Sequence, residues 1–516
     1  MPNNQTIAIS LASAGVLALV YTAWSSSPSK NASKTPHGYP IIGHIATIIQ
    51  GPQKYLISLF EGTTSNIVEA SVFGFRIYIV RGQEYVRKIL TSSQLNTRHA
   101  NPEALQELKS NERGLLLNSN IPSWKRLRKI LVESVGKARF LSGLAPKINQ
   151  YMIPVCELLD KLDNNTESGS GNGTPILANV FFGSISLDVI FDVIFTDNRR
   201  AAEGYLSTLS GVQVKENEES DVLLNHVHKV MEATLFFVLT PVVLYKYVSG
   251  FIGKAQEHRR SVEEWDLYVK GLITQKKEQI SKNGEEEETE DLATILIQEC
   301  EGSGNSEMWV QEALGLVKET IAGGTDTSSN TMCFLTFELA RNPHFADKIH
   351  EEIVEVVGAE ELTSENVEKL EFLEAAIHET TRLYAVAQMT QRAVNQDFTL
   401  GEYTLKKDSA VFVSIQPNHH SPEFWESPLK FDPTRFLESN SKDLGGPMGF
   451  GFAHLPFGHG IRKCPGEALA LKEMKLVMAN LIRRYSFVLA DPSKPLQIKD
   501  SLTLECQDLP IYFKRR

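Results

Sequence analysis

The sequence predicts a mainly helical fold with a small β region, preceded by one transmembrane helix near the N-terminus. Three observations lead to this prediction. Apolar residues recur with a helical period along most of the chain, two short runs have the alternation of strands, and residues 6–24 carry no charge. With 516 residues, of which 42% are hydrophobic, the chain can bury one large core.

The uncharged N-terminal run, Thr6 to Trp24, is long enough to cross the hydrocarbon layer of a membrane. A cleaved signal peptide is the alternative, but no Lys or Arg precedes the run, which is longer than a usual signal core. Lys30 and Lys34 follow it, so the positive-inside rule places the rest of the chain in the cytosol. We expect an anchor, a polar linker and one large domain, at 1–25, 26–35 and 36–516.

After the linker, helical periodicity dominates the chain. The clearest helical segments are 143–162, 178–199, 254–281, 308–341, 345–357, 365–384 and 467–484. Strand-like runs at 67–82 and 398–415 predict a small sheet beside the helices. The polar stretches 163–175 and 281–291 are expected to be exposed loops. The apolar run 235–253 resembles a second span, but Pro241 interrupts it and Lys246 lies inside it, which favours a core segment or a surface that dips into a membrane.

Charge and cysteine content exclude several classes of protein. Lys and Arg total 52 against 63 Asp and Glu, and the net charge of −11 argues against a general nucleic-acid binder. The five cysteines are odd in number and scattered, with no CxxC pair, so neither a disulfide framework nor a zinc site is indicated. Reduced cytosolic surroundings agree with this pattern.

One cysteine lies in an unusual context, the run "PFGHGIRKCPG" at 456–466. Its three glycines allow a tight loop whose backbone can approach something flat. Pro465 and Gly466 lead into a strong helix former, so Cys464 is expected at a helix N-terminus, where a thiolate is stabilised. Arg462 is placed to pair with a carboxylate. A Cys464–His459 nucleophile is the alternative, but it leaves the glycines unexplained, whereas an iron held by a macrocycle needs one thiolate and an open loop.

The spacing F-x-x-G-x-x-x-C-x-G, formed by Phe457, Gly460, Cys464 and Gly466, resembles the haem-binding signature of the cytochrome P-450 family. The resemblance covers roughly residue 36 to the end and implies the P-450 fold, of eukaryotic microsomal type. It also implies haem b as cofactor. Cys464 would then be the iron ligand, and the resemblance assigns contacts with the haem to Phe457, Gly458, Arg462 and Gly466.

Further motifs resemble the same family in the expected order. Glu379 and Arg382 lie three apart on one helix face, and Arg435 in "FDPTRF" would complete a buried Glu-Arg-Arg cluster. Alone, the first pair would be an ordinary surface ion pair. A buried charge that loses a partner costs several kcal/mol, so each member is expected to be essential for folding or haem retention.

The run "AGGTDTSSN" places two adjacent glycines, Gly323 and Gly324, inside a long helix. Each glycine weakens a helix by roughly 1 kcal/mol, so the presence of two glycines inside this helix needs an explanation. A close helix crossing is one explanation. The other comes from the resemblance, which implies a groove for O₂ over the iron, with Thr327 bonding into the opened helix and Asp326 near a proton path.

"WKRLR" resembles the family's W-x-x-x-R element, which implies that Trp124 and Arg128 reach a haem propionate. Arg392 falls where the family often has another propionate partner. The turn "YAVAQMT" lacks the family's usual proline, so its shape is open. Basic residues near these motifs could form a patch that, by the resemblance, docks an acidic reductase, and an ordinary solvated helix face is the alternative: Lys125, Arg126, Lys129, Lys463, Lys472 and Lys475.

The resemblance as a whole implies a monooxygenase anchored in the endoplasmic reticulum membrane by a single span, with its catalytic domain cytosolic. It implies NADPH electrons delivered by a flavoprotein reductase, with cytochrome b5 as a further candidate donor, and no nucleic-acid partner. Two alternatives stay open: a haem-thiolate isomerase or dehydratase, and a non-catalytic haem sensor. Asp326 and Thr327 argue against both.

The substrate is expected to be an apolar small molecule, with a place in secondary metabolism. Mostly apolar or small residues occupy the segments expected to line its pocket, at 100–120, 205–215, 385–390 and 500–506. This composition fits steroids, fatty acids, terpenoids and aromatic polyketides equally.

Overall fold

A computed structural model gives the structure of the chain. It describes residues 33–34, 60, 64–72, 75–98, 101–110, 113–163, 173–211, 217–283, 291–302, 306–437 and 451–516. The predicted transmembrane span at 6–24 lies outside the described residues. The chain divides into two compact units, which are described separately.

The first unit comprises Met1–His99, Gln388–Asn418 and His459–Arg462. It contains a sheet with the strand order β1-β2-β3-β8-β5, whose strands are β1 Ser33–Lys34, β2 Ile67–Val72, β3 Phe75–Val80, β8 Ser409–Ser414 and β5 Met389–Val394. The strands β2 and β3 are antiparallel, as are β5 and β8, whereas β3 and β8 are parallel. The two predicted strand runs therefore meet in one sheet.

The remaining elements of this unit are short. A separate hairpin is formed by β6 Phe398–Leu400 and β7 Tyr403–Leu405. The helices are α4 Gln83–Thr91, α18 Gln416–His419 at the unit boundary, and the 3-10 turn η5 Gly460–Arg462. The turn η5 contacts α4, which fixes the residues that lead into Cys464.

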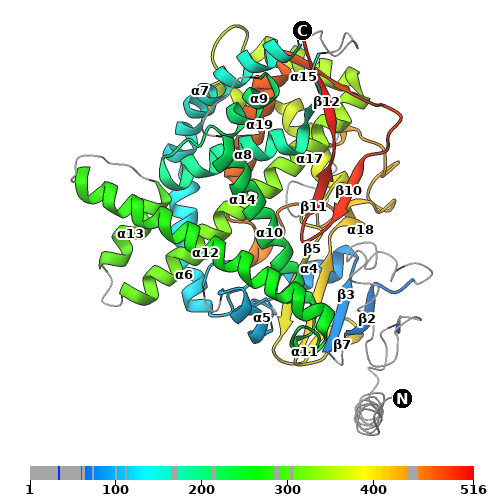
Figure 1. Ribbon diagram of the computed structural model, residues 1–516. Coiled ribbons are helices and arrows are strands. Elements are labelled where there is room, and N and C mark those ends of the chain that lie inside the picture. The colour runs from blue at the N-terminus through cyan, green and yellow to red at the C-terminus, as the bar shows by residue number, and fades with distance from the viewer. Residues whose placement is uncertain are drawn as a thin grey trace, which may run out of the picture. The chain divides into compact units, whose positions relative to one another are not determined.

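The second unit comprises Ala100–Ala387, His419–Gly458 and Lys463–Arg516 and is mainly helical. Its helices are α5 Pro102–Glu107, α6 Ile121–Val135, α7 Ala138–Asp163, α8 Ala178–Phe195, α9 Ala201–Leu209, α10 Asn217–Leu239, α11 Val242–Tyr247, α12 Ser249–Asn283, α13 Leu292–Gly302, α14 Ser306–Arg341, α15 Pro343–Val356, α16 Ser364–Glu368, α17 Glu371–Leu383, the 3-10 helix η2 Pro433–Phe436 and α19 Glu467–Ile482. The long helix α14 contacts α8, α10, α12, α13, α17 and α19, so it lies in the core of this unit (Figure 1).

Two sheets complete the second unit. Strands β4 Ile176–Leu177, β12 Pro510–Arg515 and β9 Tyr485–Leu489 form a three-stranded antiparallel sheet. Strands β10 Gln497–Asp500 and β11 Leu504–Gln507 form an antiparallel hairpin, drawn in red tones in Figure 1. The mainly helical architecture with a small β region is confirmed.

One helix among the described residues, α8, is long and apolar enough to cross a membrane. However, 89% of this stretch is buried inside the protein, so it packs as a core helix. Its Asp188 accepts hydrogen bonds from the N–H groups of Ala201 and Ala202 at 2.7 and 3.1 Å, and thereby caps α9.

Most predicted helices are present, but some boundaries were wrong. The segment 178–199 ends as a helix at Phe195 because Thr196 adopts the left-handed conformation with φ 53°. The segment 365–384 is two helices, α16 and α17, since a capping box at Thr363 starts the first and Leu370 begins the second.

The apolar run 235–253 is interrupted at Pro241, as the sequence predicts. Helix α10 ends at Leu239, and Pro241 is the N-cap of the short helix α11. In this helix Tyr245 is buried, whereas the neighbouring Tyr247 is 78% exposed. The run is therefore a core segment on one side and an exposed apolar surface on the other.

Candidate active site

Cys464 lies in the tight turn between η5 and α19. Its backbone N–H donates to the Phe457 carbonyl at 2.9 Å, and Gly458 bends the chain with φ 67°. Helix α19 begins at Glu467 with Gly466 as its N-cap, so Pro465 lies directly before the cap. A Cβ atom on Gly466 would lie 4.0 Å from the thiol sulfur, which is van der Waals contact.

The Cys464 thiol differs from the other cysteines whose side chains are described. Cys464 is exposed, whereas Cys156, Cys333 and Cys506 are buried. No three His, Cys, Asp or Glu side chains among the described residues are close enough to hold a bare metal ion. A single exposed thiolate fits a metal whose other ligands come from a macrocycle, and a porphyrin iron has this property.

Gly460 explains why the loop needs glycine. Its φ is 73°, and an added Cβ atom would lie 2.0 Å from the Leu90 carbonyl oxygen of α4. No side chain fits that space. The loop backbone consequently rests directly on the end of α4.

Three arginines gather in the first unit. Burial, together with the charges of Arg98 and Arg462, lowers the pKa of Arg392 to about 9. Arg392 lies on β5 and is 1% exposed, and its terminal nitrogen donates to Thr390 Oγ1 at 2.9 Å. Its buried Nε has no hydrogen-bond partner among the described residues. Clustered positive charge with an unsatisfied buried donor suits an anionic group, and the carboxylates of a porphyrin meet this requirement.

In the second unit, the side chains of Trp124 and Arg128 lie on α6. Trp124 is buried, and the Arg128 guanidinium lies 5.6 Å from the centre of its ring. Burial lowers the pKa of Arg128, and the negative charge of Cys464 acts in the opposite direction. Arg128 is thus close enough to the thiolate to interact with it electrostatically.

The structure brings Glu379, Arg382 and Arg435 together. Arg382 Nε donates to Glu379 Oε2 at 2.7 Å, and Arg435 Nε lies 3.4 Å from Glu379 Oε1. Arg382 also donates to the carbonyls of His419 at 2.8 Å and Pro428 at 2.7 Å. The cluster therefore fastens α17 to the irregular segment that precedes the cysteine loop.

The four residues of the glycine-acid-alcohol motif on α14 have different surroundings. A Cβ atom on Gly323 would meet no atom within 4 Å, and Thr327 Oγ1 donates to the Gly323 carbonyl at 2.7 Å. A Cβ atom on Gly324 would lie 2.6 Å from Ile190 Cδ1 of α8. Gly324 therefore permits a close helix crossing, and its assignment to the oxygen groove stays a prediction.

Asp326 points toward the β10–β11 hairpin. Its Oδ2 accepts a hydrogen bond from Thr503 Oγ1 at 2.5 Å, and Asn330 Nδ2 lies 3.3 Å from Oδ1. Burial raises the pKa of this carboxyl group, while the bond from Thr503 lowers it. Thr503 lies in the segment 500–506 predicted to line the pocket, but the sequence alone did not identify the residue, because its partner is far away in the chain.

Glu473 is a second residue that sequence reasoning missed. It lies on α19, nine residues after Cys464, and is 4% exposed. Burial raises its pKa to about 8, although the nearby Ser186 and Ser328 hydroxyls act in the opposite direction. In the sequence, the apolar residues of α19 around Glu473 were the sign that this acidic side chain is buried.

Two residues of the expected basic docking patch, Lys472 and Lys475, are buried. Lys475 is 2% exposed and lies 2.6 Å from Glu374, and the buried Lys472 lies 2.5 Å from Glu368. Arg126 lies 2.5 Å from the buried carboxylate of Glu312. Lys472 and Lys475 are therefore structural, and their assignment to a reductase surface is corrected, whereas Lys125 and Lys129 are exposed.

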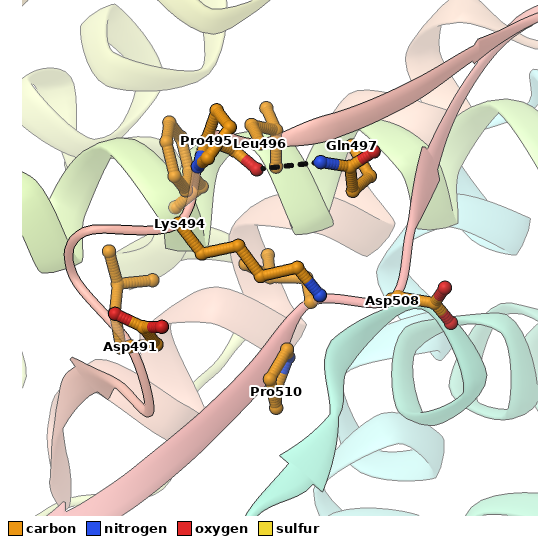
Figure 2. A pocket seen from close by; sticks show the side chains of 10 residues that line it. Asp491, Lys494, Pro495, Leu496, Gln497, Asp508 and Pro510 are labelled. Atoms are coloured by element: carbon orange, nitrogen blue, oxygen red, sulfur yellow. Dashed lines mark hydrogen bonds between the residues drawn. The ribbon is translucent and has the colours of Figure 1, made fainter.

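A small surface pocket is lined by residues other than these. Apart from Phe337 of α14, its lining comes from the connections between β9 and β12, and Figure 2 shows Lys494 reaching across it toward Asp508. None of the candidate site residues lines it.

A thiolate loop opening α19, arginines suited to carboxylates and a glycine-acid-alcohol motif on α14 define the class of haem-thiolate proteins. The sequence profile of the cytochrome P450 family matches residues 34–515. The chain belongs to the cytochrome P450 family, whose members are haem-thiolate monooxygenases.

Relatives from distant organisms are similar over most of the chain. A probable cytochrome P450 516A1 of Dictyostelium discoideum is 25% identical over 92% of this chain and 91% of its own length. Protopine 6-monooxygenase of Eschscholzia californica is 25% identical over 92% of this chain and 90% of its own. Cytochrome P450 3A7 of Homo sapiens is 28% identical over 73% of this chain and 69% of its own.

Proposed function

We propose that this chain is a membrane-anchored monooxygenase that inserts one atom of O₂ into an apolar small molecule, by hydroxylation or epoxidation. Electrons come from NADPH through a flavoprotein reductase. The observation that carries the proposal is the exposed Cys464 thiol in a glycine-bounded loop before α19. The other oxygen atom leaves as water, so each turnover consumes two electrons and two protons.

The haem, when bound, supplies the redox chemistry that activates O₂. Cys464 would hold its iron, with the narrow loop of Phe457, Gly458 and Gly466 around the sulfur. Arg392 would hold a propionate, because its buried Nε has no hydrogen-bond partner among the described residues. Further haem contacts are assigned to Arg462, Trp124 and Arg128 by the resemblance to the family.

We assign proton transfer to residues on α14. The exposed Gly323 leaves room beside the helix, and the Thr327 hydroxyl lies at that place, bonded to the Gly323 carbonyl. The Asp326 carboxyl group, one residue earlier, can take up and release a proton because burial raises its pKa. This pair favours oxygen activation over an isomerase reaction.

The proposed location is the endoplasmic reticulum membrane, with the uncharged run 6–24 as the single anchor and the catalytic domain in the cytosol. The exposed apolar side chains around α11, such as Tyr247 and Val243, support contact with a membrane as well. Cytochrome b5 is a further candidate electron donor.

The thiolate bond to iron is tested by reducing the holoprotein and adding carbon monoxide. The wild type is expected to show the far red-shifted Soret band of a thiolate complex, and Cys464→Ser is expected to lose it. Cys156→Ser, the same exchange at a buried cysteine, is the matched control and keeps the band. If the reduced wild type with carbon monoxide lacks this red-shifted Soret band, the result contradicts the proposal.

The substrate class is identified by titrating testosterone, lauric acid, limonene and naphthalene into the holoprotein while the haem spin state is recorded. These compounds represent the classes that an apolar pocket accepts. NADPH-dependent product formation with the reductase then tests catalysis.

A further inference from the structure

The Asp326 carboxyl group is held by the tip of the C-terminal hairpin. Thr503 Oγ1 donates to Asp326 Oδ2 at 2.5 Å, and both side chains are buried, at 5% and 2% exposure. Asp326 belongs to α14, whereas Thr503 directly precedes β11. The contact therefore joins residues 177 positions apart in the sequence.

Two further contacts hold the same hairpin in place. Cys506 N–H donates to Asn330 Oδ1 at 2.8 Å, one helical turn beyond Asp326. Leu504 N–H donates to the Val386 carbonyl at 2.9 Å, so the hairpin is bonded to the turn after α17. The hairpin thus connects two segments predicted to line the substrate pocket, 385–390 and 500–506, with the acidic residue of α14.

Charged groups approach Asp326 from three elements. Glu505 of β11, Lys499 of β10 and His228 of α10 all influence its pKa, and the buried thiols of Cys333 and Cys506 are also close. Lys499 lies 3.3 Å from Glu505 and 2.8 Å from the exposed Glu232 of α10. No cation is bonded directly to the Asp326 carboxyl group in the described part of the chain, and the hydrogen bond from the Thr503 hydroxyl, at 2.5 Å, is shorter than the 3.3 Å contact with Asn330.

We propose that Thr503 is a positioning residue of the monooxygenase reaction, which orients the Asp326 carboxyl group and couples it to the substrate-facing hairpin. The inference rests on the proposed function of Asp326 as a proton-handling group. When a substrate contacts the hairpin, the Thr503 hydroxyl moves, and the strength of its hydrogen bond to the Asp326 carboxyl group changes.

A threonine suits this position for a chemical reason. A hydroxyl group donates to an ionised carboxylate and, after rotating, accepts from a protonated carboxyl group. Thr503 can therefore hold Asp326 in both protonation states, as a group that repeatedly gains and loses a proton requires. Valine has the same shape but offers neither interaction.

The test compares Thr503→Val with Thr503→Ser in the full-length holoprotein. Serine keeps the hydroxyl and should restore the wild-type behaviour. Thr336→Val is the matched control, because Thr336 is fully buried on the same helix α14 and its hydroxyl has no hydrogen-bond partner among the described residues.

The first readout is infrared absorption of the Asp326 carboxyl group, assigned by its loss in Asp326→Asn. Thr503→Val is expected to shift this band, while Thr503→Ser and Thr336→Val leave it in place. The second readout is product formed per NADPH consumed, with the panel compound that gives the largest spin-state change. Thr503→Val should lower this ratio about tenfold, the effect of one lost hydrogen bond to a charged group.

An unshifted band in Thr503→Val, or an unchanged product ratio, would overturn the positioning role while the proposed function stands. A wild type that forms no product with NADPH and reductase would instead reject the proposed function, and the catalytic role of Thr503 with it. The infrared shift would in that case still report the contact, so the two failures are distinguishable.

Discussion

Arg382 and Glu379 are joined by two parallel hydrogen bonds, with Nε–Oε2 at 2.7 Å and Nη2–Oε1 at 2.8 Å, and both side chains are completely buried. The remaining Arg382 donors are used by backbone carbonyls, and Glu379 also accepts from Asp432 N–H at 2.9 Å. A buried pair satisfied on every side is stable only while both partners are present.

Replacement of Arg382 by Lys is therefore expected to lower the free energy of unfolding by about 3–5 kcal/mol, because lysine cannot form the bidentate pair. Urea denaturation followed by the haem absorbance measures this loss. The control is Arg200→Lys, since Arg200 and Glu203 form a pair with the same three-residue spacing on the surface. That exchange should cost less than about 1 kcal/mol. Equal losses in both variants would contradict the argument.

Gly460→Ala should disrupt the cysteine loop. The left-handed φ of 73° and the close approach of the Leu90 carbonyl both exclude a Cβ atom. We expect a loss of about 2–4 kcal/mol in unfolding free energy together with weakened haem retention, measured by thermal unfolding and by haem content after gel filtration. Gly250→Ala, in helix α12 with no atom near its Cβ position, is the control and should be neutral or stabilising. Retention of full stability in Gly460→Ala would show that the loop can move off α4.

The cysteine loop was predictable from the sequence because its determinants are local. Gly458, Gly460 and Gly466 reveal the turn, and the helix former that follows reveals α19. The alternation of strands and the helical periods likewise predicted the main elements, apart from boundaries set by single residues such as Thr196.

Features that depend on distant partners could not be predicted. Lys475 resembles a surface cation until Glu374 is found beside it, 101 positions away in the chain. In the sequence, Gly324 is compatible with a groove or a helix crossing, and its close approach to Ile190 is visible only in the structure. The same holds for Thr503, whose partner Asp326 is on another element.

Acid should destabilise the protein through His419. Burial, followed by the charges of His420 and Arg382, lowers its pKa to about 3, and its Nε2 accepts from Leu455 N–H at 2.8 Å. Above the ordinary pKa of 6.5 both states are neutral. Below it the unfolded chain binds a proton that the folded protein does not, so stability falls as the pH drops from 6.5 toward 3.

The expected slope from this residue is at most about 1.4 kcal/mol per pH unit. His419→Gln retains an acceptor but does not titrate, so its unfolding free energy should depend less steeply on pH between 6.5 and 4. Urea denaturation at several pH values measures both slopes. Identical slopes for the wild type and the variant would show that His419 does not titrate in this range.

Glu473 should have the opposite dependence on pH. Its folded pKa of about 8 lies above the ordinary value of 4.5, because the carboxyl group is buried between α8, α14 and α19. Between these two values the unfolded chain releases the proton while the folded protein keeps it. Stability is therefore lost as the pH rises from 4.5 to 8, by at most about 1.4 kcal/mol per pH unit.

Glu473→Gln keeps a neutral side chain of similar shape that can still donate to Ser186 or Ser328. We expect the variant to gain stability over the wild type as the pH rises from 5 to 7.5, since the amide has no proton to lose. The control is Glu133→Gln, an exposed residue on α6 whose side chain is 57% accessible. A stability difference between Glu473→Gln and the wild type that stays constant with pH would mean that Glu473 is ionised in the folded protein, and that its negative charge is stabilised in the core.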